Sequence, residues 1–212
     1  MPRIGAAVSM TLPRTGPRRR VVALGALLAV LLIASTSRWV VPYLAGSGVV
    51  VVLDAGHGGD EAGASDNGII ERDSNLDFAM RVKQRLEREG IRVVLTRTGS
   101  ARPSGPRDTS KLEGYSATFV DLQNRVRLSN RARGTLFVSL HSNSFDDRDV
   151  RGADIYYDPL RTFADRSLAL AQDVQAGLRA ALQAAGLDAP VHDPGKDTDL
   201  VDAAGTHTPL LA

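Results

Sequence analysis

The sequence predicts a single-domain α/β fold, a three-layer sandwich in which helices cover both faces of a mostly parallel, twisted sheet. Apolar runs rich in β-branched residues, typical of buried strands, alternate along the chain with segments of helical periodicity. A strand, a helix and a second strand are expected within residues 49–96, which makes a βαβ unit with parallel strands. No internal repeat interrupts this order.

A basic and then apolar segment precedes the expected domain. Three consecutive arginines, residues 18–20, stand directly before an uncharged apolar run over residues 21–34. This is the pattern of a signal peptide or a short signal anchor, and we expect an uncleaved anchor because no small-x-small cleavage site follows. The domain would then be extracytoplasmic, in the cell envelope, and held at the cytoplasmic membrane, or secreted if the leader is cleaved. The expected organisation is a basic cytoplasmic segment at 1–20, the anchor or signal peptide at 21–41, a linker at 42–48 and the folded domain at 49–212.

Charge is distributed unevenly along the chain. The net charge is +2, but six of the 26 basic residues lie within residues 1–38, where no acidic residue occurs. The other 20 basic residues face 24 acidic ones, so the domain has a net charge of −4. A nucleic-acid-binding domain needs clustered basic residues on its folded surface, so we expect no nucleic-acid partner. The chain has no cysteine, and its fold is therefore not held by disulfides.

The first half of the domain begins with a buried strand over residues 49–53. The helix that follows has an N-cap signal at Asp73-Ser74 and a stop signal at Gly90. The remaining expected elements of this half are a strand at 91–96, an exposed loop at 98–117 rich in Gly, Ser, Pro and charge, and a helix at 119–132 with Leu122, Val126 and Ser129 directed inward.

The second half contains two more strands, at 136–140 and 153–157, and the longest helix, at 163–185. Residues 190–199 are expected to form a loop. Strand-like sequence reappears near the end of the chain, at residues 200–201 and 209–211. We expect the last strand to be truncated, which would expose a sheet edge and make the stability of this chain marginal.

Two strands of the predicted sheet end in a histidine. The first leads into Asp54-Ala55-Gly56-His57-Gly58-Gly59, and the run at 136–140 leads into His141-Ser142-Asn143. Open α/β sheets build their sites at the C-terminal ends of parallel strands, so the two imidazoles should converge. Glu71, at the threshold of the first helix, completes a His/Glu/His set, the ligand type of a catalytic zinc with one position open for water.

Each of these three residues also has a simpler interpretation. His57 could be a surface residue of a glycine-rich turn, and His141 a loop or capping residue. Glu71 could be a solvated charge that favours the helix dipole. Their expected convergence on one sheet edge favours the metal site over these alternatives.

Other chemistries lack their sequence signals. Position 61 is Glu61 where a dinucleotide-binding motif needs its third glycine, and the Gly-Lys-Ser/Thr of a phosphate-binding loop is missing. The chain also has no cysteine nucleophile and no Gly-x-Ser-x-Gly motif. The other two histidines, His192 and His207, lie in polar loop sequence and are expected to be solvated.

Six stretches of the domain fall in the order of one known family. They are VVVLDAGHGG at 50–59, GIIERDSNL at 68–76, VLTR at 94–97, Asn124-Arg125 with Ser129-Asn130, FVSLHSN at 137–143 and GADIYY at 152–157. Together they resemble the type 3 family of zinc-dependent N-acetylmuramoyl-L-alanine amidases, which act on bacterial cell walls. The resemblance runs from about residue 49 to the end of the chain, so it is more specific than any single motif.

The resemblance implies that His57, Glu71 and His141 bind one Zn²⁺ per chain. It implies peptidoglycan as substrate, with hydrolysis of the amide that joins the lactyl group of N-acetylmuramic acid to L-alanine. Asp54 or a backbone carbonyl near Asn143 would orient the imidazoles. The family also carries a catalytic glutamate on its last strand, and that residue would fall just beyond Ala212.

The missing glutamate leaves three explanations open. The sequence could be a fragment of an active enzyme, Glu61 or Asp60 could substitute, or the protein could retain zinc and bind peptidoglycan with little activity. A zinc hydrolase of other small amides or peptides is a further alternative.

Some family members carry an inhibitory helix after the second histidine, but only residues 144–151 lie there, so we expect none. Peptidoglycan and the membrane are the expected partners, and an activator protein is left open.

Overall fold

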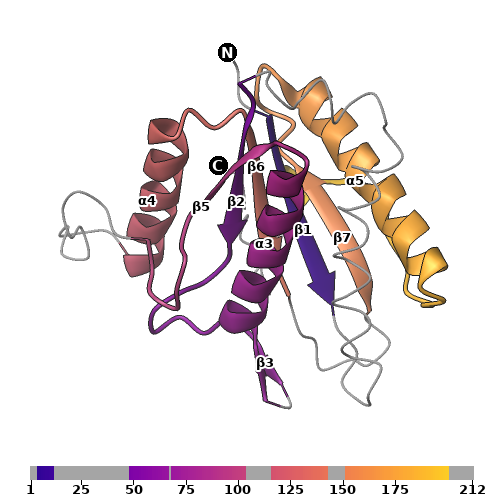
Figure 1. The fold of residues 1–212 in the computed structure, drawn as a ribbon, viewed down its shortest axis with the longest axis horizontal. Helices are drawn as coiled ribbons and strands as arrows, with labels where there is room; N and C mark the ends of the chain where they lie inside the picture. Colours follow the sequence, from indigo (N-terminus) through magenta and orange to yellow (C-terminus); the bar gives the residue numbers. More distant parts are fainter. Residues whose placement is uncertain (1–3, 12–47, 67, 104–115, 143–150, 201–212) are drawn as a thin grey trace.

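The computed structural model describes residues 4–11, 48–66, 68–103, 116–142 and 151–200. Six strands form one sheet in the order β5-β2-β6-β1-β7-β8 (Figure 1). Their bounds are β1 Ile4–Thr11, β2 Val50–Ala55, β5 Arg92–Leu95, β6 Leu136–His141, β7 Gly152–Tyr157 and β8 Gly195–Lys196. A separate two-stranded hairpin pairs β3 (Ser65–Asp66) with β4 (Ile69–Ile70). The helices are α3 Glu71–Arg88, α4 Ala117–Arg131, α5 Ala164–Ala184 and the short 3-10 helix η2 Asp197–Asp199.

Parallel pairing joins β5, β2, β6 and β1, whereas β7 runs antiparallel to β1 and parallel to β8. The predicted α/β class with a parallel sheet is therefore confirmed, with three α-helices among the described residues. Val50 is opposite Arg92, and Val51 is opposite Leu136. This register places the C-terminal ends of β2, β5 and β6 at one edge of the sheet, where the sequence predicts the site.

Strand β2 is buried along its whole length, as expected for a β-branched run with structure on both faces. Val51, Leu53 and Ala55 belong to a core that includes side chains of α3 and α5. Asp54 points to the other face, where it accepts a hydrogen bond from Arg125 of α4. The sheet therefore separates α4 from α3 and α5.

Helix α3 begins earlier than predicted. Its first residue is Glu71, two positions before the predicted N-cap at Asp73-Ser74. Ser74 instead donates its hydroxyl to the backbone carbonyl of Glu71, at 3.0 Å. Gly90 follows the helix with φ +77°, as predicted for its stop. The early start puts the Glu71 carboxylate at the positive end of the helix.

Helix α4 is rotated relative to the orientation predicted from its apolar stripe, so the face it buries only partly overlaps that stripe. Leu122 and Val126 are 45% and 39% exposed, so the prediction that they point inward is wrong, whereas the prediction for Ser129 is correct. The sheet face beneath α4 carries Asp54, and a polar helix face with a cation satisfies it. The buried residues of α4 are Val120, Asp121, Asn124, Arg125 and Ser129.

Helix α5 follows its prediction closely. Ala171, Val174, Leu178 and Leu182, at helical spacing, are all buried in the core. The stretch at 190–199, predicted as a loop, contains β8 and η2 instead. It is tied to the sheet through a bridge between Val191 and Ala153.

Strand β1 is the largest departure from the sequence prediction. It lies between β6 and β7, with Ser9 paired to His141 on one side and Asp154 on the other. The sequence did not predict a strand at this position, and the location of residues 1–20 relative to a membrane stays a prediction. Small residues at 5–7 lack the β-branched pattern that marks a strand.

Several predicted features fall outside the described residues. These are nearly all of the anchor and linker, the end of the chain from residue 201, and nearly all of the stretch where no inhibitory helix is expected. Among the helices of the described residues, none has the length and hydropathy needed to cross a membrane.

Candidate metal centre

His57 lies just beyond the end of β2, in a backbone conformation that residues other than glycine rarely adopt. Its φ is +62°, in the left-handed region. Three successive carbonyl groups, those of Ala55, Gly56 and His57, accept hydrogen bonds from two guanidinium groups. The bonds are Arg97 Nε to Ala55 O (2.9 Å), Arg97 Nη2 to Gly56 O (2.9 Å), Arg125 Nη1 to Ala55 O (2.8 Å) and Arg125 Nη2 to His57 O (2.8 Å). The two arginines thus hold the backbone that carries His57.

Glu71 directly follows the β3–β4 hairpin in the chain and is only 4% exposed. Its backbone N–H donates to the Ala64 carbonyl at 2.8 Å, and its Oε2 accepts from the Ala64 N–H at 2.9 Å. Its Oε1 accepts from the Ser142 N–H at 3.1 Å and from Asn75 Nδ2 at 3.4 Å. Both carboxylate oxygens are therefore fixed in direction.

His141 is the last residue of β6, and its ring lies over Gly56. A Cβ added at Gly56 would stand 2.8 Å from His141 Nδ1 and closer still to other ring atoms. Gly63 makes a second close approach, since a Cβ there would lie 2.7 Å from Glu71 Oε2 and 2.8 Å from His57 Nε2. Glycine is required at both positions for the three side chains to meet.

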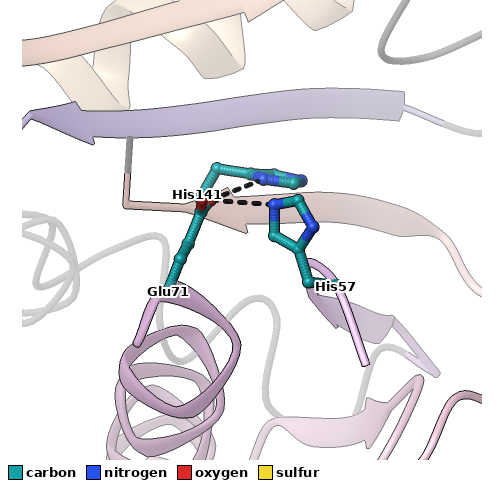
Figure 2. A group of neighbouring side chains, drawn as sticks. All are labelled: His57, Glu71 and His141. Atoms are coloured by element: carbon teal, nitrogen blue, oxygen red, sulfur yellow. Dashed lines mark hydrogen bonds and ion pairs between the residues drawn. The ribbon is translucent and has the colours of Figure 1, made fainter. Parts of the chain in front are cut away.

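The three side chains converge from two strand ends and one helix start (Figure 2). His57 Nε2 is 3.2 Å and His141 Nδ1 is 3.0 Å from the same oxygen, Glu71 Oε1. The imidazole centroids are 4.9 Å apart in an edge-to-face arrangement. One ligand atom from each residue lies within 4.8 Å of the others, so the group could hold a metal ion.

The chemistry of this donor set fits a transition-metal ion. Burial would raise the pKa of Glu71, but hydrogen bonds with His141, His57 and the Ala64 amide hold that pKa well below its ordinary value. The carboxylate is therefore ionised at neutral pH. Two imidazoles and one carboxylate are a donor set of catalytic zinc sites.

Asp54, predicted to orient the imidazoles, has no hydrogen bond to either histidine and acts through Arg125. Burial would raise its pKa, but the Arg125 charge and hydrogen bonds from Thr96, Arg125 and Ser139 hold the pKa below its ordinary value. The donors to Asp54 are Thr96 Oγ1 (2.6 Å), Arg125 Nη1 (2.6 Å) and Ser139 Oγ (2.8 Å). Asn143, the other predicted neighbour, lies outside the described residues.

Sequence reasoning assigned no role to the residues that hold this site. Arg125 is 3% exposed and also pairs with Asp121 at 2.8 Å, and Arg97 is 4% exposed. Asn75 is buried beside Glu71 and accepts from Ser142 Oγ at 2.8 Å. Both arginines stand in stretches that resemble the amidase family, but arginine is mostly exposed in proteins, and no local pattern marks these two as buried.

The two carboxylates considered as substitutes for a catalytic base differ in position. Glu61 Oε1 is 4.0 Å from His57 Nδ1, the ring nitrogen opposite the one that faces Glu71. Asp60 is more exposed, 90% at its side chain, and pairs with Arg102 at 2.8 Å. Neither makes a hydrogen bond to Glu71 or His141 among the described residues. His192 is outside the cluster and pairs with Asp154 at 2.7 Å.

A parallel α/β sheet that brings two histidines and an ionised glutamate together at its C-terminal edge defines a candidate metal-dependent hydrolase. Sequence comparison gives the family. The profile of the N-acetylmuramoyl-L-alanine amidase family Amidase_3 matches residues 51–199, and the chain belongs to this family of hydrolases.

Similar proteins carry the name of this family. The chain is 34% identical over 135 residues to the N-acetylmuramoyl-L-alanine amidase LytC of Bacillus subtilis, which covers 64% of this chain and 24% of LytC. It is 36% identical over 112 residues to the germination-specific N-acetylmuramoyl-L-alanine amidase of the same organism, with 52% and 46% covered. The chain thus spans between a quarter and a half of the length of these relatives. Among solved structures, the N-acetylmuramoyl-L-alanine amidase AmiC2 of Nostoc punctiforme superposes with a TM-score of 0.52 at 32% identity, covering 70% of this chain and 69% of AmiC2.

Proposed function

We propose that the protein is a zinc-dependent enzyme that hydrolyses the amide bond between N-acetylmuramic acid and L-alanine in peptidoglycan, during cell-wall remodelling. The observation that carries this proposal is the convergence of His57, Glu71 and His141 within 4.8 Å in a chain of the amidase family. The finer architecture that we expect, a three-layer sandwich, is part of the same proposal.

His57, Glu71 and His141 would hold the zinc ion. Bound there, zinc would supply a water ligand of lowered pKa and polarisation of the amide carbonyl. Arg97 and Arg125 contribute by fixing the backbone of His57, so that the ligand does not have to be ordered when the metal arrives. The carboxylate of Glu71 contributes its negative charge, which its hydrogen bonds maintain.

The reaction also needs a group that takes a proton from water and returns one to the leaving amine. Within this chain we keep Glu61 and Asp60 as candidates for that role. By family resemblance the role belongs to a catalytic glutamate on the last strand of the family's fold. Removing a positioned acid–base group lowers the rate by about 10²–10⁴-fold, so Glu61→Gln and Asp60→Asn should show which of the two contributes.

The direct test is release of stem peptides from purified peptidoglycan by the full chain. We expect a chelator to abolish release, and added zinc to restore it. Glu71→Gln should remove zinc binding and activity together, whereas Glu87→Gln, on an exposed part of the same helix, should leave both unchanged. Release that is insensitive to chelation would contradict the proposal.

A second candidate function is zinc-retaining peptidoglycan binding with little or no activity. It is favoured by the position of Glu61 on the side of His57 that faces away from Glu71. Co-sedimentation with insoluble peptidoglycan, without release of stem peptides and with zinc bound, would support it. Turnover of peptides that lack muramic acid would instead indicate a different zinc hydrolase.

We also propose that residues 21–41 anchor the domain on the outer side of the cytoplasmic membrane. Residues 1–20 would then be cytoplasmic, and this topology requires that β1 leave the sheet. The chain has no cysteine, so single cysteines at Thr15 and Asp188 can be labelled in intact cells with a membrane-impermeant maleimide. Anchoring predicts labelling at position 188 alone. Labelling at both positions would mean that β1 stays with the exported sheet.

A further inference from the structure

The end of the molecule opposite the candidate metal centre is a distinct surface. Strands β2, β5 and β6 all begin there, as the register of Val50 with Arg92 and the 2.8 Å hydrogen bond from Thr135 N–H to the Val50 carbonyl show. Helices α3 and α4 end at this pole and α5 begins there, toward the top of Figure 1. We name as the basic pole the surface formed by Arg88, Arg92, Arg131, Arg133 and Leu160.

The four arginines of the basic pole carry charge that is largely uncompensated. All four are exposed, and none makes a hydrogen bond or ion pair to any other described residue. Three acidic side chains nearby are already paired, Glu87 with Lys83, Glu89 with Arg85 (2.9 Å) and Asp158 with Arg161 (2.8 Å). Asp165, at the start of α5, makes no ion pair with another described residue and offsets one of the four positive charges. The pole is therefore positively charged.

The positive pole contrasts with the rest of the domain. Residues 49–212 have a net charge of −4, so the part of the domain outside these four arginines carries −8. Near an anionic surface, this separation of charge turns the basic pole toward the surface and the metal-site end away from it.

Leu160 adds an apolar contact to the same pole. It is 80% exposed, the highest value among the exposed large hydrophobic side chains of the described residues. The loop that carries it is fixed, because Asp158 Oδ1 accepts from the Leu160 N–H at 2.8 Å and Asp158 Oδ2 accepts from Arg161 Nε at 2.8 Å. A protruding apolar side chain at the same pole as exposed cations is the pattern of a protein surface that enters the headgroup region of a bilayer.

Arg133 occupies its position against its own backbone preference. Its φ is +56°, in the left-handed region that glycine adopts without strain. The next residue, Gly134, cannot be exchanged for a larger one, because a Cβ there would lie 2.6 Å from the Val52 side chain. A glycine at 133 would relieve the strain, so the arginine keeps a positive charge at the pole at a cost in stability.

We propose that the basic pole docks on the anionic headgroups of a lipid bilayer, with Leu160 entering the headgroup region and the candidate metal centre directed away from the membrane. The chain also enters β2 at this pole, so any attachment through the preceding segment reaches the membrane from the same side. The anionic charge of the bilayer matches the four free arginines, and each arginine near such a surface contributes attraction that salt weakens.

The test uses the full chain with a single cysteine, either Leu160→Cys or Asp188→Cys, labelled with an environment-sensitive fluorophore. Asp188 is fully exposed and lies beyond the other end of α5, toward the metal-site end. The proteins are bound to vesicles of phosphatidylcholine with 30% phosphatidylglycerol, or of phosphatidylcholine alone, carrying nitroxide-labelled lipid. We expect quenching of the probe at 160 but not at 188, stronger on the anionic vesicles and reduced by salt. Insertion of residues 21–34 into both kinds of vesicle would itself bring this pole close to the membrane, so the dependence of quenching at 160 on anionic lipid and on salt carries the test.

Charge variants test whether attachment depends on the basic pole or only on the net charge of the protein. Arg92→Glu, Arg131→Glu and Arg133→Glu together should lower quenching at position 160 by about tenfold at fixed lipid concentration. The control, Arg81→Glu, Arg151→Glu and Arg179→Glu, changes the net charge equally at positions away from the pole and should leave quenching unchanged. Equal loss in both triples, or equal quenching at 160 and 188, would overturn the proposal. So would a probe at 160 that responds to a soluble anionic polymer but not to anionic vesicles.

Arg133→Gly gives an independent check. It should raise the Tm by relieving the left-handed strain and should weaken attachment to anionic vesicles by about fivefold. A raised Tm with unchanged attachment would show that Arg133 does not act at the membrane. That result would contradict the proposed docking of the basic pole.

Discussion

His57 and His141 reach the same carboxylate from two neighbouring parallel strands, but the backbone around each is held by different means. His57 stands past the end of β2 in a left-handed conformation, and the carbonyls on either side of Gly56 are bound by Arg125. His141 remains within β6, which is paired on both sides, and its ring rests on Gly56. His57 is positioned by buried charge, and His141 by strand pairing and close packing.

The difference shows what each position requires. A histidine on a loop has unpaired backbone carbonyls, and buried guanidinium groups satisfy them here, with the charge of Arg125 balanced by Asp54. A histidine on a strand has its backbone satisfied by the sheet, so only the space for its side chain has to be kept free. Variants of the first support should therefore cost stability, and variants of the second should cost metal-site geometry.

Arg125→Met should have the largest effect, because it leaves the buried carboxylates of Asp54 and Asp121 without their cation. We expect the free energy of unfolding, measured by urea denaturation of the metal-free protein, to fall by about 3–5 kcal/mol. Arg127→Met, on the exposed side of the same helix, should change it by less than about 0.5 kcal/mol. Similar values for the two variants would mean that the His57 loop does not depend on buried charge.

Asp54→Asn should lower stability by about 3 kcal/mol near pH 7, and the deficit should depend on pH. The pKa of Asp54 is lower in the folded protein than in the unfolded chain, so its carboxylate stabilises the fold above about pH 4. This contribution is lost as the pH falls through the folded-state pKa. Urea denaturation at several pH values should show the deficit shrinking below about pH 4. The control is Asp77→Asn, whose parent side chain is 62% exposed, and a deficit of Asp54→Asn that is constant with pH would refute the linkage.

Gly56→Ala tests the support of His141. The added methyl group overlaps the imidazole and must displace it, at a cost of about 1–3 kcal/mol in stability. We expect zinc affinity, measured by competition with a chromogenic chelator, to fall by about 10–100-fold. Gly99→Ala is the matched control, since a Cβ there meets no atom within 4 Å. Unchanged zinc affinity in Gly56→Ala would show that the ring does not need this space.

Two serine variants give the smallest expected effects and compare the two supports directly. Ser139 donates to the ionised Asp54 at 2.8 Å, and Ser142 donates to the neutral side chain of Asn75 at the same distance. Ser139→Ala should therefore cost about 2 kcal/mol and Ser142→Ala about 1 kcal/mol in urea denaturation. A larger stability loss in Ser142→Ala than in Ser139→Ala would contradict the distinction between a hydrogen bond to the charged Asp54 and one to the neutral Asn75.

The residues that converge at the site were predictable because their signals are local and the topology brings them together. An apolar run followed by a histidine marks the end of β2 and of β6, and parallel strands share one edge. Glu71 was found for the same reason, although the start of α3 was misplaced by two residues.

The supports of the site were not predictable from local pattern. Arg125 meets Asp54 across 71 positions of sequence, and the orientation of α4 follows from that pair rather than from its apolar stripe. Leu122 and Val126 show the limit plainly, since periodicity identifies a stripe but not the side of the helix on which the sheet lies. Strand β1 was not predicted because its small residues lack the β-branched pattern that marks a strand.

The hydrogen bond from Arg125 to the His57 carbonyl spans 68 positions of the chain, and this separation bears on when the site can form. The backbone of His57 reaches its final conformation only after α4 has docked on the sheet, which is a late event because long-range contacts close slowly. A chain that crosses a membrane before folding would therefore have no assembled metal site during transit. With the zinc binding and the export that we propose, the metal would come from the medium in which folding finishes, and the supply of zinc outside the cytoplasm would set the yield of the loaded protein.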